Sequence, residues 1–134
     1  MANFKQKDNQ LYRQKLNRER IRKYLVISGI SLIFFIFGVW ELTNPQYWSA
    51  FVPSFLAKII NNLVLVRIHG IILIFLALWL SVGFYRKIAA ILSSLVLLNI
   101  ILFLLFSSGF SDIVVRDLAI FLFSVSLIFE EEKR

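Results

Sequence analysis

LVLVRIHGIILIFLALWLSVGF, residues 63–84, is an apolar run interrupted near its start by one arginine and one histidine. A helix that crosses a bilayer needs about 20 mostly apolar residues, because each residue rises ~1.5 Å and the hydrocarbon core is ~30 Å thick. Three further apolar runs occupy residues Tyr24–Trp40, Ile88–Phe106 and Ile113–Phe129. The sequence therefore predicts an all-α fold, a bundle of four transmembrane helices.

The composition agrees with a membrane domain and narrows the chemistry. Of the 134 residues, 59% are hydrophobic and 17% are charged, whereas soluble domains are about 25% charged. The chain has no cysteine and a single histidine. Disulfides, thiolate metal sites and a multi-histidine metal or haem site within one chain are therefore excluded, and we expect no metal site.

Basic residues indicate how the chain is oriented. Residues 1–23 hold eight basic and two acidic side chains, a net charge of +6, and a second basic pair, Arg86 and Lys87, separates the second run from the third. Basic segments next to spans remain in the cytoplasm and attract anionic lipids. We therefore expect a cytoplasmic tail at 1–23, a transmembrane domain at 24–129 and a charged cytoplasmic end at 130–134, with no role for nucleic acid.

The connection Glu41–Asn62 is expected to lie outside and contains both prolines of the chain. The sequence before Pro45 predicts a turn, because a residue that precedes proline avoids the helical region. Beyond Pro53, apolar residues recur at helical spacing between polar ones. This pattern predicts a short amphipathic helix, Pro53–Asn61, that lies in the outer membrane interface and caps the bundle.

Ionisable residues near the predicted outer ends of the spans form the candidate ligand-binding site. Such residues are costly in a bilayer and by default mark function; they are Glu41, Arg67, His69, Arg116 and Asp117. Helical spacing predicts that Glu41, Arg67 and Asp117 meet about 6 Å below the outer boundary. His69 lies about 200° around the helix from Arg67 and cannot share its stripe, but it could face a neighbouring helix, the interfacial helix or another subunit. A structural ion network that fixes helix register is the competing interpretation.

Small and polar residues are expected to pack the helices against one another. In membranes, close packing depends on small residues and on hydrogen bonds between helices. The candidates are Ser31, Gly70, Asn99 and Ser124. For Asn99, near the middle of its run, a hydrogen bond to another helix is favoured over contact with a ligand.

The order of several motifs resembles the DoxX-like family, including its DoxD relatives. The motifs are Gly38-Val39-Trp40-Glu41, Val66-Arg67-Ile68-His69-Gly70 and Val115-Arg116-Asp117-Leu118. The resemblance extends from Gly29 to Phe129, and the Arg-Asp pair is its most specific element. It implies a four-helix protein of a prokaryotic cytoplasmic membrane and a membrane redox role, since family members are linked to quinone-reducing oxidoreductases and oxidative-stress complexes.

Two functions follow from these observations and stay open. The first is binding of a quinone or another lipophilic small molecule at the charged cluster, where arginine or histidine donates hydrogen bonds and the carboxylates relay protons. The second is a non-catalytic structural or assembly subunit, either self-associating or docked to a larger membrane complex. Whether the chain is itself an enzyme is left open. A transporter is disfavoured, because four helices are too few for an internal repeat.

Overall fold

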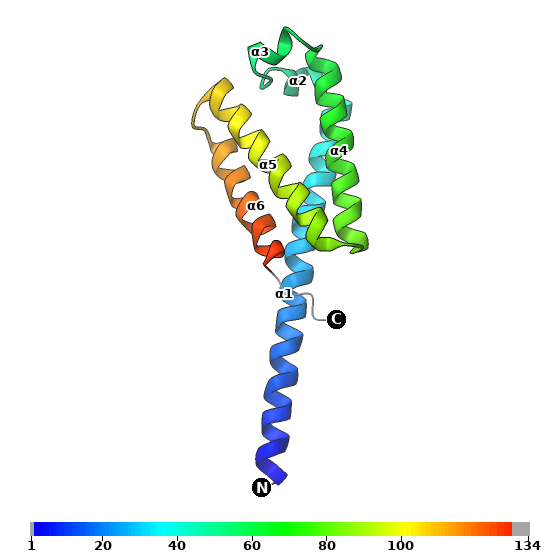
Figure 1. The fold of residues 1–134 in the computed structure, drawn as a ribbon, viewed down its shortest axis with the longest axis vertical. Coiled ribbons are helices and arrows are strands. Elements are labelled where there is room, and N and C mark those ends of the chain that lie inside the picture. Colours follow the sequence, from blue (N-terminus) through cyan, green and yellow to red (C-terminus); the bar gives the residue numbers. More distant parts are fainter. Residues whose placement is uncertain (1, 130–134) are drawn as a thin grey trace.

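The computed structural model describes residues 2–129, and all regular structure in that range is helical. Three of the described helices, α1, α4 and α5, are long and apolar enough to cross a membrane, which confirms the prediction of an all-α membrane protein. α6 has 17 residues and is the shortest of the four main helices. The elements are α1 Ala2–Thr43, α2 Pro45–Ser49, α3 Ser54–Ala57, α4 Asn62–Val82, α5 Arg86–Ser108 and α6 Asp112–Ile128 (Figure 1).

α1 and α4 form the first helix pair and touch at two glycines. A Cβ atom on Gly38 would lie 2.7 Å from the carbonyl oxygen of Gly70, and a Cβ on Gly70 would lie 2.8 Å from that of Gly38. Both distances are too short for real atoms, so the backbones can meet only because neither residue has a side chain. This crossing fixes how α4 is positioned along α1.

α5 and α6 form the second pair, which small residues also hold together. The hydroxyl oxygens of Ser94 and Ser124 lie 3.1 Å apart, and the carbonyl oxygen of Ala90 lies 2.8 Å from the first and 3.3 Å from the second. Ser124 is fully buried. Buried hydroxyls and a helix carbonyl thus satisfy one another where no water is at hand.

A hydrophobic core joins the two pairs in the inner part of the bundle. Its buried members come from all four long helices: Ile30, Phe34, Leu73, Leu76, Ala77, Leu80, Ala89, Leu97 and Ile120. The link between α4 and α5 is very short. Gly83 and Tyr85 adopt left-handed conformations with φ of 82° and 48°, and Trp79 Nε1 donates to the Phe84 carbonyl at 2.6 Å. Beyond this turn α5 diverges from α4 (Figure 1).

The connection between α1 and α4 agrees with the prediction at Asn44, which is not helical and separates α1 from α2, and differs from it in two places. A helix that was not predicted, α2, starts at Pro45, because proline fits the first helical position and needs no hydrogen-bond partner for its nitrogen. The predicted helix Pro53–Asn61 is wrong in length, since α3 ends at Ala57. Asn61 instead caps α4, accepting a hydrogen bond from the Leu63 amide at 2.9 Å, so the chain must leave α3 before that residue.

The basic tail is continuous with the first span. α1 runs without a break from Ala2 to Thr43, and its N-terminal half extends beyond the bundle (Figure 1). Most side chains between residues 5 and 23 are exposed. The tail is therefore a projecting helix and not a separate surface segment.

Candidate functional site

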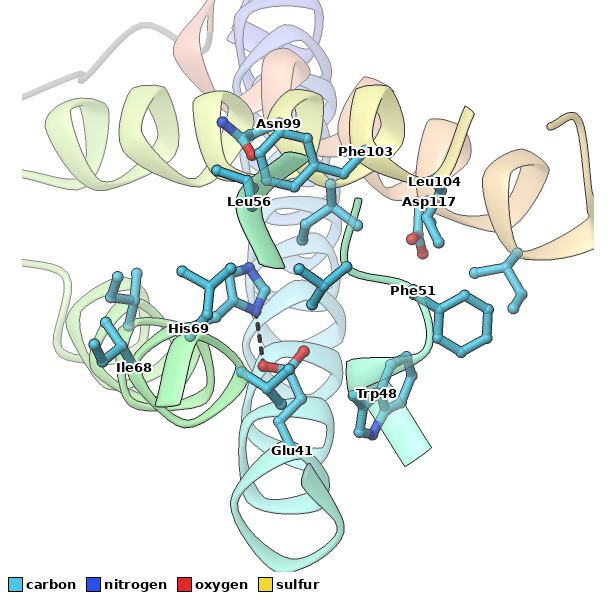
Figure 2. A pocket seen from close by; sticks show the side chains of 16 residues that line it. Glu41, Trp48, Phe51, Leu56, Ile68, His69, Asn99, Phe103, Leu104 and Asp117 are labelled. Atoms are coloured by element: carbon cyan, nitrogen blue, oxygen red, sulfur yellow. Dashed lines mark hydrogen bonds and ion pairs between the residues drawn. The ribbon is translucent and has the colours of Figure 1, made fainter. Parts of the chain in front are cut away.

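A cavity of about 360 Å³ lies between the two helix pairs, beneath α2 and α3 (Figure 2). Every helix of the domain contributes to its wall, and most of the lining is apolar. The lining residues are Glu41, Trp48, Phe51, Val52, Leu56, Leu65, Val66, Ile68, His69, Ile72, Asn99, Ile100, Phe103, Leu104, Ile113 and Asp117. Cavities of this size between bundle helices, with a few polar groups in an apolar wall, are typical of small-molecule sites.

A carboxylate and an imidazole form the main polar contact in the cavity. Glu41 Oε2 lies 2.7 Å from His69 Nδ1, and Glu41 is 7% exposed. The glycine contact brings them together, because a Cβ on Gly70 would lie only 3.1 Å from Glu41 Cβ. The bare backbone of α4 at Gly70 therefore leaves room for Glu41 beside the preceding residue, His69.

The contact with Glu41 orients the imidazole toward the cavity. An ionised carboxylate only accepts hydrogen bonds, so with Glu41 ionised the proton of this contact belongs to His69 Nδ1. The other ring nitrogen faces away from Glu41, in Figure 2 on the side of Asn99. Nε2 is therefore available to a bound molecule, as an acceptor on neutral histidine and as a donor on the cation.

Asp117 is a second carboxylate that lines the cavity, and its cationic partner, Arg116, lies outside the cavity. Asp117 is buried, and its Oδ1 accepts a hydrogen bond from Arg116 Nε at 2.9 Å and forms an ion pair with Nη2, also at 2.9 Å. The Arg116 side chain is 43% exposed, does not line the cavity, and places its guanidinium over the Phe37 ring at 4.5 Å. Arg116 thus balances the charge of Asp117 from the outside of the bundle.

Arg67 is exposed and does not line the cavity, so the predicted convergence of Glu41, Arg67 and Asp117 is wrong for this arginine. The buried stripe of α4 runs through Val66, Gly70, Leu73 and Ala77. Arg67 lies one residue, or about 100°, away from that stripe. His69, one step from Gly70, takes the place beside Glu41 that was expected for Arg67.

The residues expected to pack helices have different environments. Gly70 and Ser124 lie in the α1–α4 and α5–α6 contacts described above, and Ser31 is buried with a hydroxyl that has no hydrogen-bond partner among the described residues. Asn99 is exposed, lines the cavity, and makes no side-chain hydrogen bond within residues 2–129. The prediction that Asn99 bridges two helices is therefore wrong, because its side chain faces the cavity.

The sequence predicts only the segment after Pro53 as a cover for the cavity, and the contribution of residues 48–52 was not predicted. Trp48, Phe51, Val52 and Leu56 line it from above. Trp48 packs edge-on against Phe37 of α1, with ring centres 5.6 Å apart, and also contacts Phe51 at 5.9 Å. Aromatic residues near the outer boundary are typical of a membrane belt, whereas Trp48 of α2 lines the cavity.

The polar groups of the cavity lie apart from one another. Figure 2 shows Glu41 and His69 on one side, Asp117 on another, and Asn99 and Phe103 across from Glu41. Within the described residues no group of histidine and carboxylate side chains could hold a metal ion. The arrangement suits a mostly apolar molecule with hydrogen-bonding atoms at its ends.

No protein-family model, curated protein or solved structure matches this chain. Membership of the DoxX-like family therefore stays a prediction from the motifs quoted above.

Proposed function

We propose that this protein binds a quinone of the membrane in the cavity, as part of a membrane redox process. The observation that carries the proposal is the imidazole of His69, held by Glu41 at 2.7 Å in the wall of an apolar cavity of about 360 Å³. An apolar ring would pack against the aliphatic and aromatic lining. Its carbonyl would meet the free nitrogen of His69, which binds carbonyls when it is protonated.

The polar residues also suit the reduced form of the ligand. A quinone that accepts two electrons takes up two protons and becomes a hydroquinone. A charged His69 can donate one of these protons from Nε2 and becomes neutral, the other proton comes from water, and Glu41 stabilises the charged imidazole before the transfer. Asp117 can accept a hydrogen bond from a hydroquinone hydroxyl elsewhere in the cavity. The chain's residues bind the ring and hold protons, and a redox partner supplies the electrons.

We infer that α6 is a fourth span and that both ends of the domain are cytoplasmic. Seventeen residues extend about 26 Å as a helix, slightly less than a bilayer core. Its packing beside α5 and the basic residues Arg86 and Lys87 at the inner turn support this orientation. α3 would then lie at the outer interface, with exposed Phe55, Ile59 and Ile60 toward lipid. These features agree with a DoxX-like protein of a prokaryotic cytoplasmic membrane.

The test is direct extraction and binding. Protein purified in mild detergent is extracted with organic solvent, and lipids and quinones in the extract are identified by mass spectrometry. Binding of a benzoquinone is then measured for wild type and for His69→Ala, Glu41→Gln and Arg67→Gln. The first two substitutions should weaken binding, and Arg67→Gln is the matched control on the same helix. Absence of quinone binding in wild type would overturn the proposal.

A non-catalytic assembly subunit is the second candidate, favoured by the projecting half of α1. A helix with eight basic residues between positions 5 and 23 extends beyond the bundle (Figure 1) and offers a surface to anionic lipids or an acidic partner. Purification from native membranes in mild detergent distinguishes the quinone-binding protein from the assembly subunit. Co-purification of a second copy or a larger complex, together with an extract free of quinone, would favour the assembly subunit.

A further inference from the structure

The wall of the cavity between α4 and α5 differs from the other walls. Ile68 and Ile72 of α4 line the cavity, yet they are 49% and 41% exposed to solvent, unlike the buried or half-buried residues of the other walls. Asn99 of α5 also lines the cavity and is exposed. A residue that borders a cavity and the exterior at once marks an opening. The cavity therefore opens between these two helices.

The other sides are closed by direct contacts. The glycine crossing of Gly38 and Gly70 seals α1 against α4. Buried apolar residues, Ile101, Leu104 and Val114, seal α5 against α6. The Arg116 guanidinium, over the ring of Phe37 at 4.5 Å, covers the contact of α6 with α1.

The roof is attached to α5 above the opening. The ring of Phe55, beside α3 residue Leu56 of the cavity wall, meets Phe103 of α5 edge-on with centres 6.3 Å apart. The opening thus lies on the flank of the bundle and below this aromatic contact.

The short inner turn explains why the opening exists. α4 and α5 are joined by three residues, 83–85, and diverge from that point (Figure 1). The wedge between them is therefore widest toward the outer end, where α3 covers it. Ile72 lies ten residues into α4, about 15 Å from its start, which places the opening at the depth of lipid chains.

We propose that this opening is a lateral portal, and that the ligand is a quinone with a long apolar tail. The ring lies in the cavity against His69, and the tail leaves between α4 and α5 along Ile68 and Ile72 into the bilayer. This inference rests on the proposed quinone binding and adds to it the route of entry and the class of ligand. If the bound molecule had no tail, lipid chains would occupy the portal.

Asn99 is assigned as the polar residue of the portal rim. Its amide has no partner within the described residues and faces the cavity, in Figure 2 on the side of the free nitrogen of His69. It can donate to a ring carbonyl or a ring ether oxygen where the tail joins the head group. Asn99 therefore positions the ring and orients its tail toward the opening.

The experiment blocks the portal and compares two probes. Ile72→Trp fills the gap, and Ile71→Trp is the matched control, because Ile71 is 58% exposed and does not line the cavity. Binding of a benzoquinone with a decyl tail and of the same ring without a tail is measured in nanodiscs. Ile72→Trp should weaken binding of the tailed quinone at least about tenfold more than it weakens binding of the tail-less ring, because Ile72 also lines the cavity.

A second measurement uses the wild-type protein and does not depend on a variant that folds. A quinone with a photoreactive group on its tail is cross-linked in the membrane, and the labelled peptides are identified by mass spectrometry. Labels should lie within residues 68–72 or at Asn99. Equal affinities of Ile72→Trp and Ile71→Trp, or labels confined to α1 and α6, would overturn the portal alone. Failure of both probes to bind wild type would overturn the portal and the quinone site together.

Discussion

Glu41 and His69 connect α1 to α4 through a contact of 2.7 Å between Oε2 and Nδ1, one turn from the place where the two helix backbones touch. The polar centre of the cavity and the close contact between Gly38 and Gly70 are therefore one local structure. A substitution at the glycine contact should therefore alter the contact between Glu41 and His69, and the reverse should also hold.

Glu41→Gln should weaken quinone binding by about tenfold and leave the fold intact. The amide is close in size to the carboxylate but cannot stabilise a protonated His69, so a charge-assisted hydrogen bond worth roughly 1.5–3 kcal/mol is lost. The measurement is equilibrium binding of a benzoquinone to protein in nanodiscs. Arg67→Gln, an exposed change on α4, should bind like wild type. Equal losses in both variants would show that the effect is not specific to the cavity.

Asp117→Ala should lower the melting temperature in detergent, because removal of Asp117 leaves Arg116 without its carboxylate partner. A fully buried pair costs ~3–5 kcal/mol when one member is removed, and we expect about 2 kcal/mol here since the Arg116 side chain is 43% exposed. Adding Arg116→Leu to Asp117→Ala should recover part of the loss.

The rescue experiment also separates the two arginines near the site. Adding Arg67→Leu to Asp117→Ala should recover nothing, because Arg67 does not line the cavity beside Asp117. Recovery by Arg67→Leu but not by Arg116→Leu would mean that Asp117 pairs across the bundle and not with its neighbour.

Gly38→Ala should destabilise the protein by about 1–3 kcal/mol, the range for a group forced into a packed contact. Its methyl group would meet the carbonyl oxygen of Gly70 and Ile74 Cγ1, each at 2.7 Å. Gly29→Ala on the same helix is the control, because no atom lies within 4 Å of its added Cβ. The melting temperature of Gly38→Ala should fall clearly relative to wild type, whereas that of Gly29→Ala should rise or change little. Equal shifts in the two variants would contradict the close crossing.

Single cysteines should report the topology, since the chain has none of its own. An impermeant thiol reagent added to intact cells should label Ser107→Cys, between α5 and α6, and should not label Gln6→Cys in the tail. Phe129→Cys, just beyond α6, should behave like Gln6→Cys if α6 spans the membrane. Labelling of Ser107→Cys and Phe129→Cys alike from outside would place α6 on the surface.

The membrane fold could be predicted from apolar run length, because that signal depends on composition alone. The faces of the helices were harder to predict. In α4, the stripes Arg67-Gly70-Ile74-Ala77 and Val66-Gly70-Leu73-Ala77 share Gly70 and Ala77 and have nearly the same spacing. The structure buries the second stripe, although Gly38 also contacts Ile74 of the first. Which stripe is buried depends on how the neighbouring helices pack, and the spacing within one helix does not record that.

The candidate site could be predicted only in part, because the directions of its side chains also depend on contacts between helices. The structure brings Glu41, His69 and Asp117 to one cavity and leaves Arg67 and Arg116 outside it. The direction in which Asn99 faces depends on the angle between α4 and α5, which the three-residue turn sets. The roof depends on α2, a five-residue helix, and helices this short carry too little periodicity to be recognised.

The unbroken course of α1 has a consequence for its charges. Residues 5–23 of a straight helix span about 27 Å, several times the ~8 Å over which physiological salt screens charge. With α1 across the bilayer, Arg20, Arg22 and Lys23 lie at the level of the lipid phosphates, whereas Lys5 and Lys7 stand more than two screening lengths away. The part of the projecting helix near residue 23 therefore interacts electrostatically with the membrane surface, whereas the part near residue 5 is screened from it.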